Sequence, residues 1–138
     1  MIVLDTNVIS EALRPLPSAK VLAWLRSEPI ASVFTTAITE AELLYGVALL
    51  PDGGRRRALE AAIMQVLATQ FSGRILPFDS TAAREFADIA ATRRQGGRPI
   101  GEADARIAAI ARSRGALLAT RNVVDFADCG LTLVDPWL

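Results

Sequence analysis

The chain opens with Met1-Ile2-Val3-Leu4-Asp5-Thr6-Asn7, a short apolar strand that runs directly into a carboxylate. In an open parallel sheet, ligands bind in the crevice beyond the carboxyl ends of the strands, so an acid at this place usually faces a site. The alternative is that Asp5 only caps a helix that starts near Thr6 or Asn7. The choice depends on whether other acids converge on the same place.

Apolar strand-like segments alternate with helical ones along the rest of the chain. Strands are expected at residues 2–5, 33–35, 74–78, 117–120 and 131–134, and helices near 21–26, 38–50, 57–70, 81–94 and 101–114. Strands separated by helices with short connections form a parallel sheet with helices on both faces. The length is that of one domain, so we expect a single α/β domain over residues 1–138.

The composition removes several classes of chemistry. The chain contains no His and one Cys, Cys129, which excludes imidazole catalysis, His-ligated zinc, an internal disulfide and a cysteine metal cluster. No apolar run approaches the roughly 18 residues of a membrane helix, and the first residues lack the pattern of a signal peptide, so we expect a cytoplasmic protein. The formal net charge is zero, and any contact with nucleic acid must therefore be local.

The strongest physical signal is Asp104, in the helix expected at residues 101–114. With about 100° of rotation per residue, Asp104 falls inside the apolar arc and projects between Ala108 and Ala111. An unpaired buried charge costs several kcal/mol, so a partner must compensate it. The partner is either an ion pair, the backbone amides of the first helical turn, or a bound cation.

Two other segments supply further candidates. Glu40 and Glu42 flank the apolar face of the helix expected at residues 38–50, and periodicity does not choose between them, although Gly46 leaves room beside Glu42. Thr120 and Asn122 follow the strand expected at 117–120, and Asp125 comes within the next turn. If that strand neighbours the first one, this segment faces the same crevice as Asp5; otherwise it is a polar turn.

Asp5, Glu42, Asp104 and the Asn122–Asp125 segment would together form a site with oxygen ligands only. Such a donor set suits Mg²⁺ or Mn²⁺ and suits zinc poorly. Metal bound there can activate water and stabilise the charge that develops on a phosphodiester during cleavage.

Four segments carry a resemblance to a known family: residues 2–7, 38–46, 103–109 and 119–122. In this order and spacing they resemble the PIN-domain nucleases, and most closely the VapC toxins and the FitB proteins. The resemblance spans the chain as far as Asp135-Pro136-Trp137. It implies a PIN-like three-layer α/β/α fold with a central, mostly parallel twisted sheet of about five strands, and a metal-dependent endoribonuclease that cleaves single-stranded or loop RNA.

The resemblance also assigns roles to residues. Asp5 and Asp104 would be the chief Mg²⁺ or Mn²⁺ ligands, Glu42 would assist, and Thr6 and Thr120 would support the acids by hydrogen bonds. The family's fourth acid is replaced here by Asn122. Asp125 could substitute for it, or Asn122 could order a water molecule.

The same resemblance implies partners. These are an RNA substrate, a second copy of the chain in a homodimer, and a small antitoxin of the VapB or FitA kind. The antitoxin tail would occupy the acidic groove, and operator DNA would be bound only through the antitoxin. No membrane partner is expected.

Two rival functions differ in their predictions. A haloacid-type phosphohydrolase normally carries a second carboxylate two residues after the first, but that residue is Asn7 here, and the only lysine, Lys20, lies in the wrong context. The other rival is a binding module whose acidic pocket docks an antitoxin or tethers DNA without turnover.

Some side chains near the motifs are candidates for a secondary role. By proximity, Arg93, Arg94, Arg98 and Arg121 are candidates for guiding an RNA strand. The aromatic residues Trp24, Phe126 and Trp137 are expected in the core or in dimer contacts rather than as platforms for base stacking.

Overall fold

The computed structural model describes all 138 residues and contains one five-stranded sheet in which every strand pair is parallel. The strands follow the order β3-β2-β1-β4-β5, with bounds Ile75–Leu76, Val33–Thr36, Ile2–Leu4, Leu117–Ala119 and Leu133–Val134. β1 lies in the centre, so Ile2 is paired with Val33 on one side and with Leu117 on the other. Because all strands run the same way, their carboxyl ends meet at one edge of the sheet.

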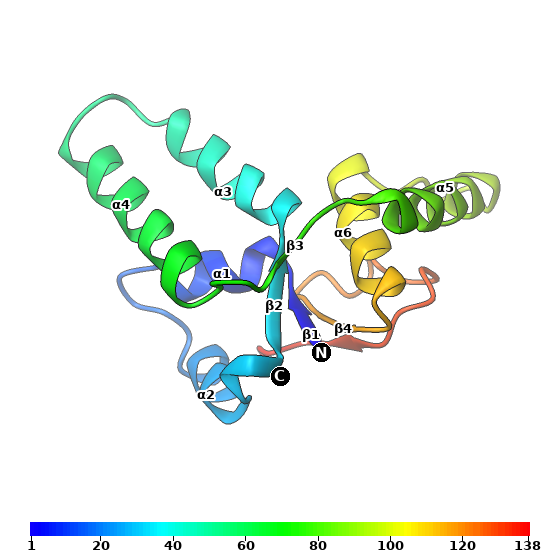
Figure 1. Cartoon of the computed structure of the whole chain (residues 1–138), viewed down its shortest axis with the longest axis horizontal. Helices are drawn as coiled ribbons and strands as arrows, with labels where there is room; N and C mark the ends of the chain where they lie inside the picture. The colour runs from blue at the N-terminus through cyan, green and yellow to red at the C-terminus, as the bar shows by residue number, and fades with distance from the viewer.

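Six α-helices cover the sheet, in agreement with the predicted three-layer α/β/α arrangement (Figure 1). The chain order is α1, α2, α3, α4, α5 and α6, with a 3₁₀ turn at Ile30–Ser32 between α2 and β2. Their bounds are Thr6–Ala12, Ala19–Ser27, Ala37–Ala48, Gly54–Thr69, Ser80–Gln95 and Glu102–Ser113. Figure 1 shows α3 and α4 as an antiparallel arm on one side of the molecule and α5 and α6 on the other.

The alternation of side chains along β1 divides the core between the two faces of the sheet. Val3 belongs to a cluster with residues of α5 and α6, such as Ile89 and Ile107. Ile2 and Leu4 belong to a second cluster with residues of α1, α2, α3 and α4. Both faces of the first strand are therefore buried, which accounts for its continuous apolar sequence.

The structure confirms the predicted α/β class and defines the direction of the strands and the bounds of the elements. The sheet was expected to be mostly parallel, and all four strand pairs are parallel. Four of the five strands are shorter than expected, whereas β2 extends to Thr36, one residue beyond the expected 33–35. The helix expected from residue 57 begins at Gly54, directly after the positive-φ Gly53. None of the six α-helices combines the length and the hydropathy that a membrane-spanning helix needs.

Candidate functional site

Asp5 is both a helix cap and a pocket residue, so the two interpretations of the opening sequence hold together. Its backbone N–H donates to the carbonyl of Ala119 at 2.9 Å, and its Oδ1 accepts from the N–H of Thr6 at 2.8 Å. Its Oδ2 accepts from the hydroxyl of Thr120 at 2.7 Å and from the side-chain amide of Asn7 at 3.2 Å. Burial raises the pKa of Asp5, and the hydrogen bonds from Thr120 and Thr6 oppose that rise.

Thr120 connects the end of β4 to the end of β1. While its hydroxyl donates to Asp5, the same oxygen accepts from the backbone N–H of Asn122 at 3.0 Å. Thr120 is fully buried, so neither bond competes with bulk water. The expected meeting of the two strand ends is therefore present, and the polar turn after β4 is fastened to the first carboxylate.

The structure places Glu42 and Glu40 in different surroundings. Glu42 lies on α3, where its Oε1 accepts a hydrogen bond of 2.7 Å from the hydroxyl of Thr6, and it lines the same pocket as Asp5. Glu40 does not line that pocket. Thr36 caps the start of this helix, because its side chain accepts from the N–H of Thr39 at 3.1 Å.

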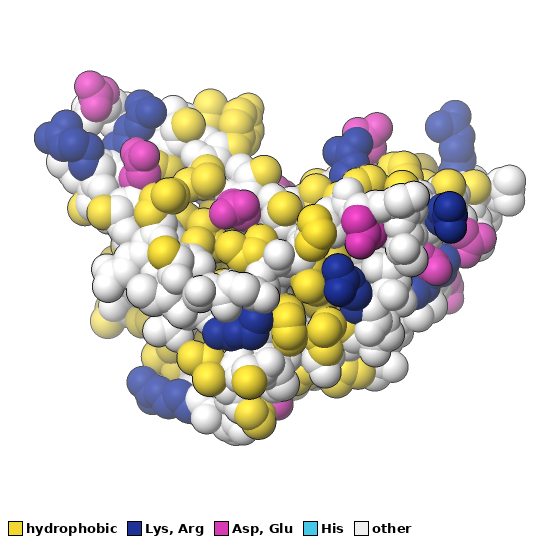
Figure 2. Space-filling model, in the orientation of Figure 1, with side chains coloured by type: hydrophobic (Ala, Val, Ile, Leu, Met, Phe, Trp, Pro, Cys, Tyr) yellow, Lys and Arg dark blue, Asp and Glu magenta, His cyan; other side chains and the backbone are white.

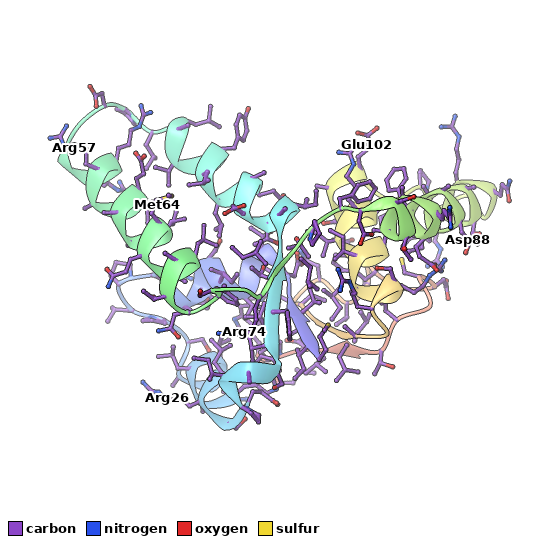
Figure 3. All side chains as sticks on the ribbon, viewed as in Figure 1. Arg26, Arg57, Met64, Arg74, Asp88 and Glu102 are labelled. Carbon is purple, nitrogen blue, oxygen red and sulfur yellow. The ribbon has the colours of Figure 1, made fainter.

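Asp104 is the acid without a compensating contact. It lies in the first turn of α6, is half-buried, and makes neither a hydrogen bond nor an ion pair. Glu102 in the same turn instead points outward (Figure 3) and pairs with Arg106 at 3.4 Å. Burial and the charges of Asp5, Glu42 and Asp125, in that order, raise its pKa from 3.8 to about 6. Of the compensators expected from the sequence, the ion pair and the backbone amides are both absent.

These acids share a polar pocket of about 460 Å³ at the carboxyl edge of the sheet. Asn122 lines the pocket, whereas Asp125 does not and is exposed beside it. The charge of Asp125 nevertheless contributes to the raised pKa values of Asp5 and Asp104. The remaining lining residues are Asp5, Thr6, Asn7, Ser10, Glu11, Arg14, Glu42, Asp104, Arg121 and Trp137.

Sequence reasoning gave no role in the site to four of these lining residues, Asn7, Ser10, Glu11 and Arg14, all on or just after α1. Glu11 is buried, accepts from the N–H of Ser18 at 3.2 Å and lies 3.4 Å from Arg14. The available signal was helical spacing within α1, since Ser10 lies four residues after the predicted site residue Thr6.

The proposed RNA-guiding role does not suit Arg93. Its side chain is buried, and its guanidinium donates to the backbone carbonyls of Arg98, Asp125 and Ala127 at 2.8 to 2.9 Å. Arg98 pairs with Asp128, which leaves only Arg94 and Arg121 of the four candidates exposed and without an ion pair.

The aromatic residues follow the expectation in part. Phe126 is buried in the core, and Trp24 packs partly buried against the second core cluster. Trp137 packs against that cluster too, but it also lines the acidic pocket, where the guanidinium of Arg121 lies 5.1 Å from the centre of its ring.

The donor set of the pocket fits a hard divalent cation. Asp5, Glu42 and Asp104 offer only oxygen. Burial raises the pKa of Asp104 most, and repulsion from neighbouring acids adds to the rise; a cation would compensate the buried charge and relieve the repulsion. No three acidic side chains are close enough together to hold one ion as they stand. The structure therefore presents a shared acidic pocket rather than an assembled metal cage.

Comparison with known proteins agrees with this geometry. The family model described as "PIN domain" matches residues 2–128. The chain belongs to the PIN-domain family. It is 42% identical to VapC ribonuclease Y4jK of Sinorhizobium fredii over 99% of this chain and 98% of that protein, and 43% identical to toxin FitB of Neisseria gonorrhoeae over 99% of both. A solved structure of FitAB bound to an IR36 DNA fragment contains a similar chain, with a TM-score of 0.93 and 42% identity over 100% of this chain and 96% of that one.

As a PIN-domain protein of the VapC and FitB type, the chain carries each of the four segments in the part of the fold that forms the pocket. Segment 2–7 contains β1 and the start of α1, and segment 119–122 begins at the last residue of the neighbouring β4. Segments 38–46 and 103–109 are parts of α3 and α6. The resemblance seen in the sequence is thus also a resemblance in three dimensions.

Proposed function

We propose that this protein is the ribonuclease toxin of a toxin–antitoxin pair and that it cleaves single-stranded or loop RNA with Mg²⁺ or Mn²⁺ in the acidic pocket. The observation that carries the proposal is Asp104, a half-buried acid with no compensating contact beside Asp5 and Glu42. Full-length similarity to VapC ribonuclease Y4jK supports the same activity.

Each residue of the pocket has a distinct task in this proposal. Asp5 and Asp104 hold the metal, and Glu42 assists. Metal bound there would supply a water of lowered pKa for attack on the phosphate and would stabilise the charge on the phosphodiester. Thr120 and Thr6 orient the carboxylates of Asp5 and Glu42 through hydrogen bonds of 2.7 Å.

The end of β4 contributes an amide where the family has its fourth acid. Asn122 lines the pocket and can order a water molecule, whereas Asp125 acts from outside the pocket through its charge. We therefore assign the metal to Asp5, Asp104 and Glu42, and expect Asn122 to contribute through water.

We further propose that an antitoxin binds beside this pocket. A groove of about 530 Å³ between α1, α3 and α4 has apolar walls that include Leu13, Leu43 and Ile63. The groove shares Glu42 and Arg14 with the acidic pocket. An apolar antitoxin segment in the groove could place a basic side chain among the acids, and operator DNA would be bound through the antitoxin, a role consistent with the DNA complex of FitAB.

A second copy of the chain is the other proposed protein partner. Tyr45, Leu49 and Met64 are large apolar side chains, each more than half exposed, on α3, its C-terminal cap and α4. Figure 2 shows apolar side chains gathered on this arm. Exposed apolar surface of this kind is typical of association sites, and the family implies a homodimer. Sedimentation equilibrium of the purified chain tests this assignment.

RNA cleavage by the antitoxin-free protein tests the activity. Single-stranded RNA should be cut in the presence of Mg²⁺ or Mn²⁺ and left intact with EDTA. The variants Asp5→Asn and Asp104→Asn should fold and lose cleavage, while Asp52→Asn, a variant at an exposed acid, should retain it. Undiminished cleavage by either pocket variant contradicts the site. RNA binding without metal-dependent cleavage would instead support the non-catalytic binding module, in which the pocket serves only for docking.

A further inference from the structure

Arg121 is the cation of the acidic pocket that remains available to a ligand. Two arginines line the pocket, and Arg14 lies 3.4 Å from the carboxylate of Glu11. Arg121 has no acid within 4.0 Å and is exposed. An unpaired guanidinium at the rim of a pocket otherwise lined by acids is the natural contact for an anion.

The side chain of Arg121 is also held in place. Its guanidinium lies over the ring of Trp137, 5.1 Å from the ring centre, and Trp137 is itself packed against the second core cluster. A long flexible side chain loses conformational freedom when a ligand immobilises it, and this loss weakens binding. Stacking on a fixed ring removes part of that cost before the ligand arrives.

The backbone of Arg121 is tied to the carboxylate at the centre of the site. Its N–H donates to Oδ1 of Asn7 at 3.3 Å, and the amide of Asn7 donates to Oδ2 of Asp5 at 3.2 Å. One side chain thus connects Arg121 with Asp5. An anion held by Arg121 would therefore lie in the same pocket as the proposed point of cleavage.

We propose that Arg121, supported by Trp137, binds a backbone phosphate of single-stranded RNA next to the phosphate that is cut. This inference rests on the proposed function and adds the residue that positions the strand. The planar guanidinium offers several N–H donors to phosphate oxygens while one of its faces remains on the ring. Since the acids repel an RNA strand, a fixed cation at the rim gives the strand a defined place and direction of entry.

Binding and cleavage can be measured separately. Fluorescence anisotropy with a short labelled oligouridylate is carried out in the Asp104→Asn background, where the strand binds without being cut. In that background Arg121→Gln should weaken binding about tenfold. It should also lower the slope of log K against log salt by about 0.7, the value for one phosphate contact in a single strand.

Three further variants make the measurement specific. Arg84→Gln, on the exposed side of α5 and outside the pocket, should leave both affinity and slope unchanged. Arg121→Lys should keep the slope and recover only part of the affinity, because it retains the charge but not the planar fork. Trp137→Phe should weaken binding severalfold, and only when Arg121 is present.

The outcomes separate this inference from the proposed function. If wild-type protein cleaves RNA with metal but Arg121→Gln changes neither affinity nor slope, the phosphate contact is wrong and the nuclease assignment stands. If wild-type protein does not cleave RNA under any metal condition, the proposed function is wrong whatever Arg121 does. Equal losses for Arg121→Gln and Arg84→Gln would also overturn the inference, because they indicate a general effect of charge.

Discussion

Removing the charge of Asp104 should stabilise the metal-free protein while it abolishes cleavage. The carboxylate is half-buried, makes no hydrogen bond or ion pair, and lies near the charges of Asp5 and Glu42. A change of pKa from 3.8 to about 6 corresponds to about 3 kcal/mol at about 1.4 kcal/mol per tenfold change in proton affinity. Solvent screening and the favourable N-terminus of α6 reduce this amount, so we expect Asp104→Asn to gain about 1 kcal/mol at pH 8.

The gain should depend on pH in a defined direction. Because the pKa of Asp104 is raised in the folded state, the folded protein binds a proton between pH 3.8 and about 6 that the unfolded chain has released. Wild-type stability from this group is therefore present below pH 3.8 and is lost as pH rises through about 6. The advantage of Asp104→Asn should vanish near pH 4, grow as the pH rises through about 6, and be close to its full value at pH 8.

Chemical denaturation of the metal-free proteins between pH 4 and 8 measures this effect, and thermal unfolding should show a gain of about 3 °C at pH 8. Saturating Mg²⁺ or Mn²⁺ should raise the stability of wild-type protein and have little effect on Asp104→Asn. Asp52→Asn, at an exposed acid, is the matched control and should change neither quantity. If Asp104→Asn lowers stability at pH 8, the carboxylate has a compensating contact in the folded protein, and the reasoning from repulsion is refuted.

Three further predictions test individual residues in and near the site. Thr120→Val removes the hydroxyl that donates to Asp5 and accepts from the N–H of Asn122. Metal affinity, measured by calorimetry, should fall about 10-fold to 100-fold while the fold is kept. Unchanged metal affinity would argue against a supporting role for Thr120. Arg93→Met removes the guanidinium that donates to three backbone carbonyls. The free energy of unfolding, measured by urea denaturation, should fall by about 3 kcal/mol. A loss below about 1 kcal/mol would contradict a structural role for Arg93. Glu42→Gln should reduce metal-dependent RNA cleavage at least tenfold, whereas Glu40→Gln should not. If the cleavage assay finds the larger loss for Glu40→Gln, Glu40 and not Glu42 assists the metal.

The parts of the fold that follow from local pattern were predictable from the sequence. The continuous apolar sequence of β1 predicts a strand that is buried on both faces, as it is in the structure. The small apolar residues of α6 recur with the helical period and predict a helix. Strand ends were less predictable. The strand expected at residues 74–78 is only Ile75–Leu76, since pairing at the edge of the sheet ends where the partner strand ends, and the sequence of β3 does not contain that information.

The residues of the candidate site likewise fall into those that the local sequence pattern could identify and those that it could not. Asp104 could be found from its own helix, because a carboxylate inside an apolar arc violates the local pattern. The choice of Glu42 over Glu40 depends on Thr6, which is 36 residues away, and periodicity within α3 carries no such information. Arg93 illustrates the opposite error. Its position near the motifs indicated a role in RNA binding, but its partners are backbone carbonyls, which have no signature in a sequence.

These contacts explain how the pocket keeps its shape while its charges repel one another. Asp5 is fastened by Thr120, Thr6 and Asn7, and Glu42 by Thr6, so two of the three acids are oriented by neutral donors. Such donors stabilise a carboxylate without cancelling its charge. Asp104 is the acid that no donor restrains, and it approaches from the opposite face of the sheet on α6. A cation entering the pocket would therefore meet two fixed carboxylates and one that is free to adjust, and Asp104 is the side chain whose movement should report metal binding.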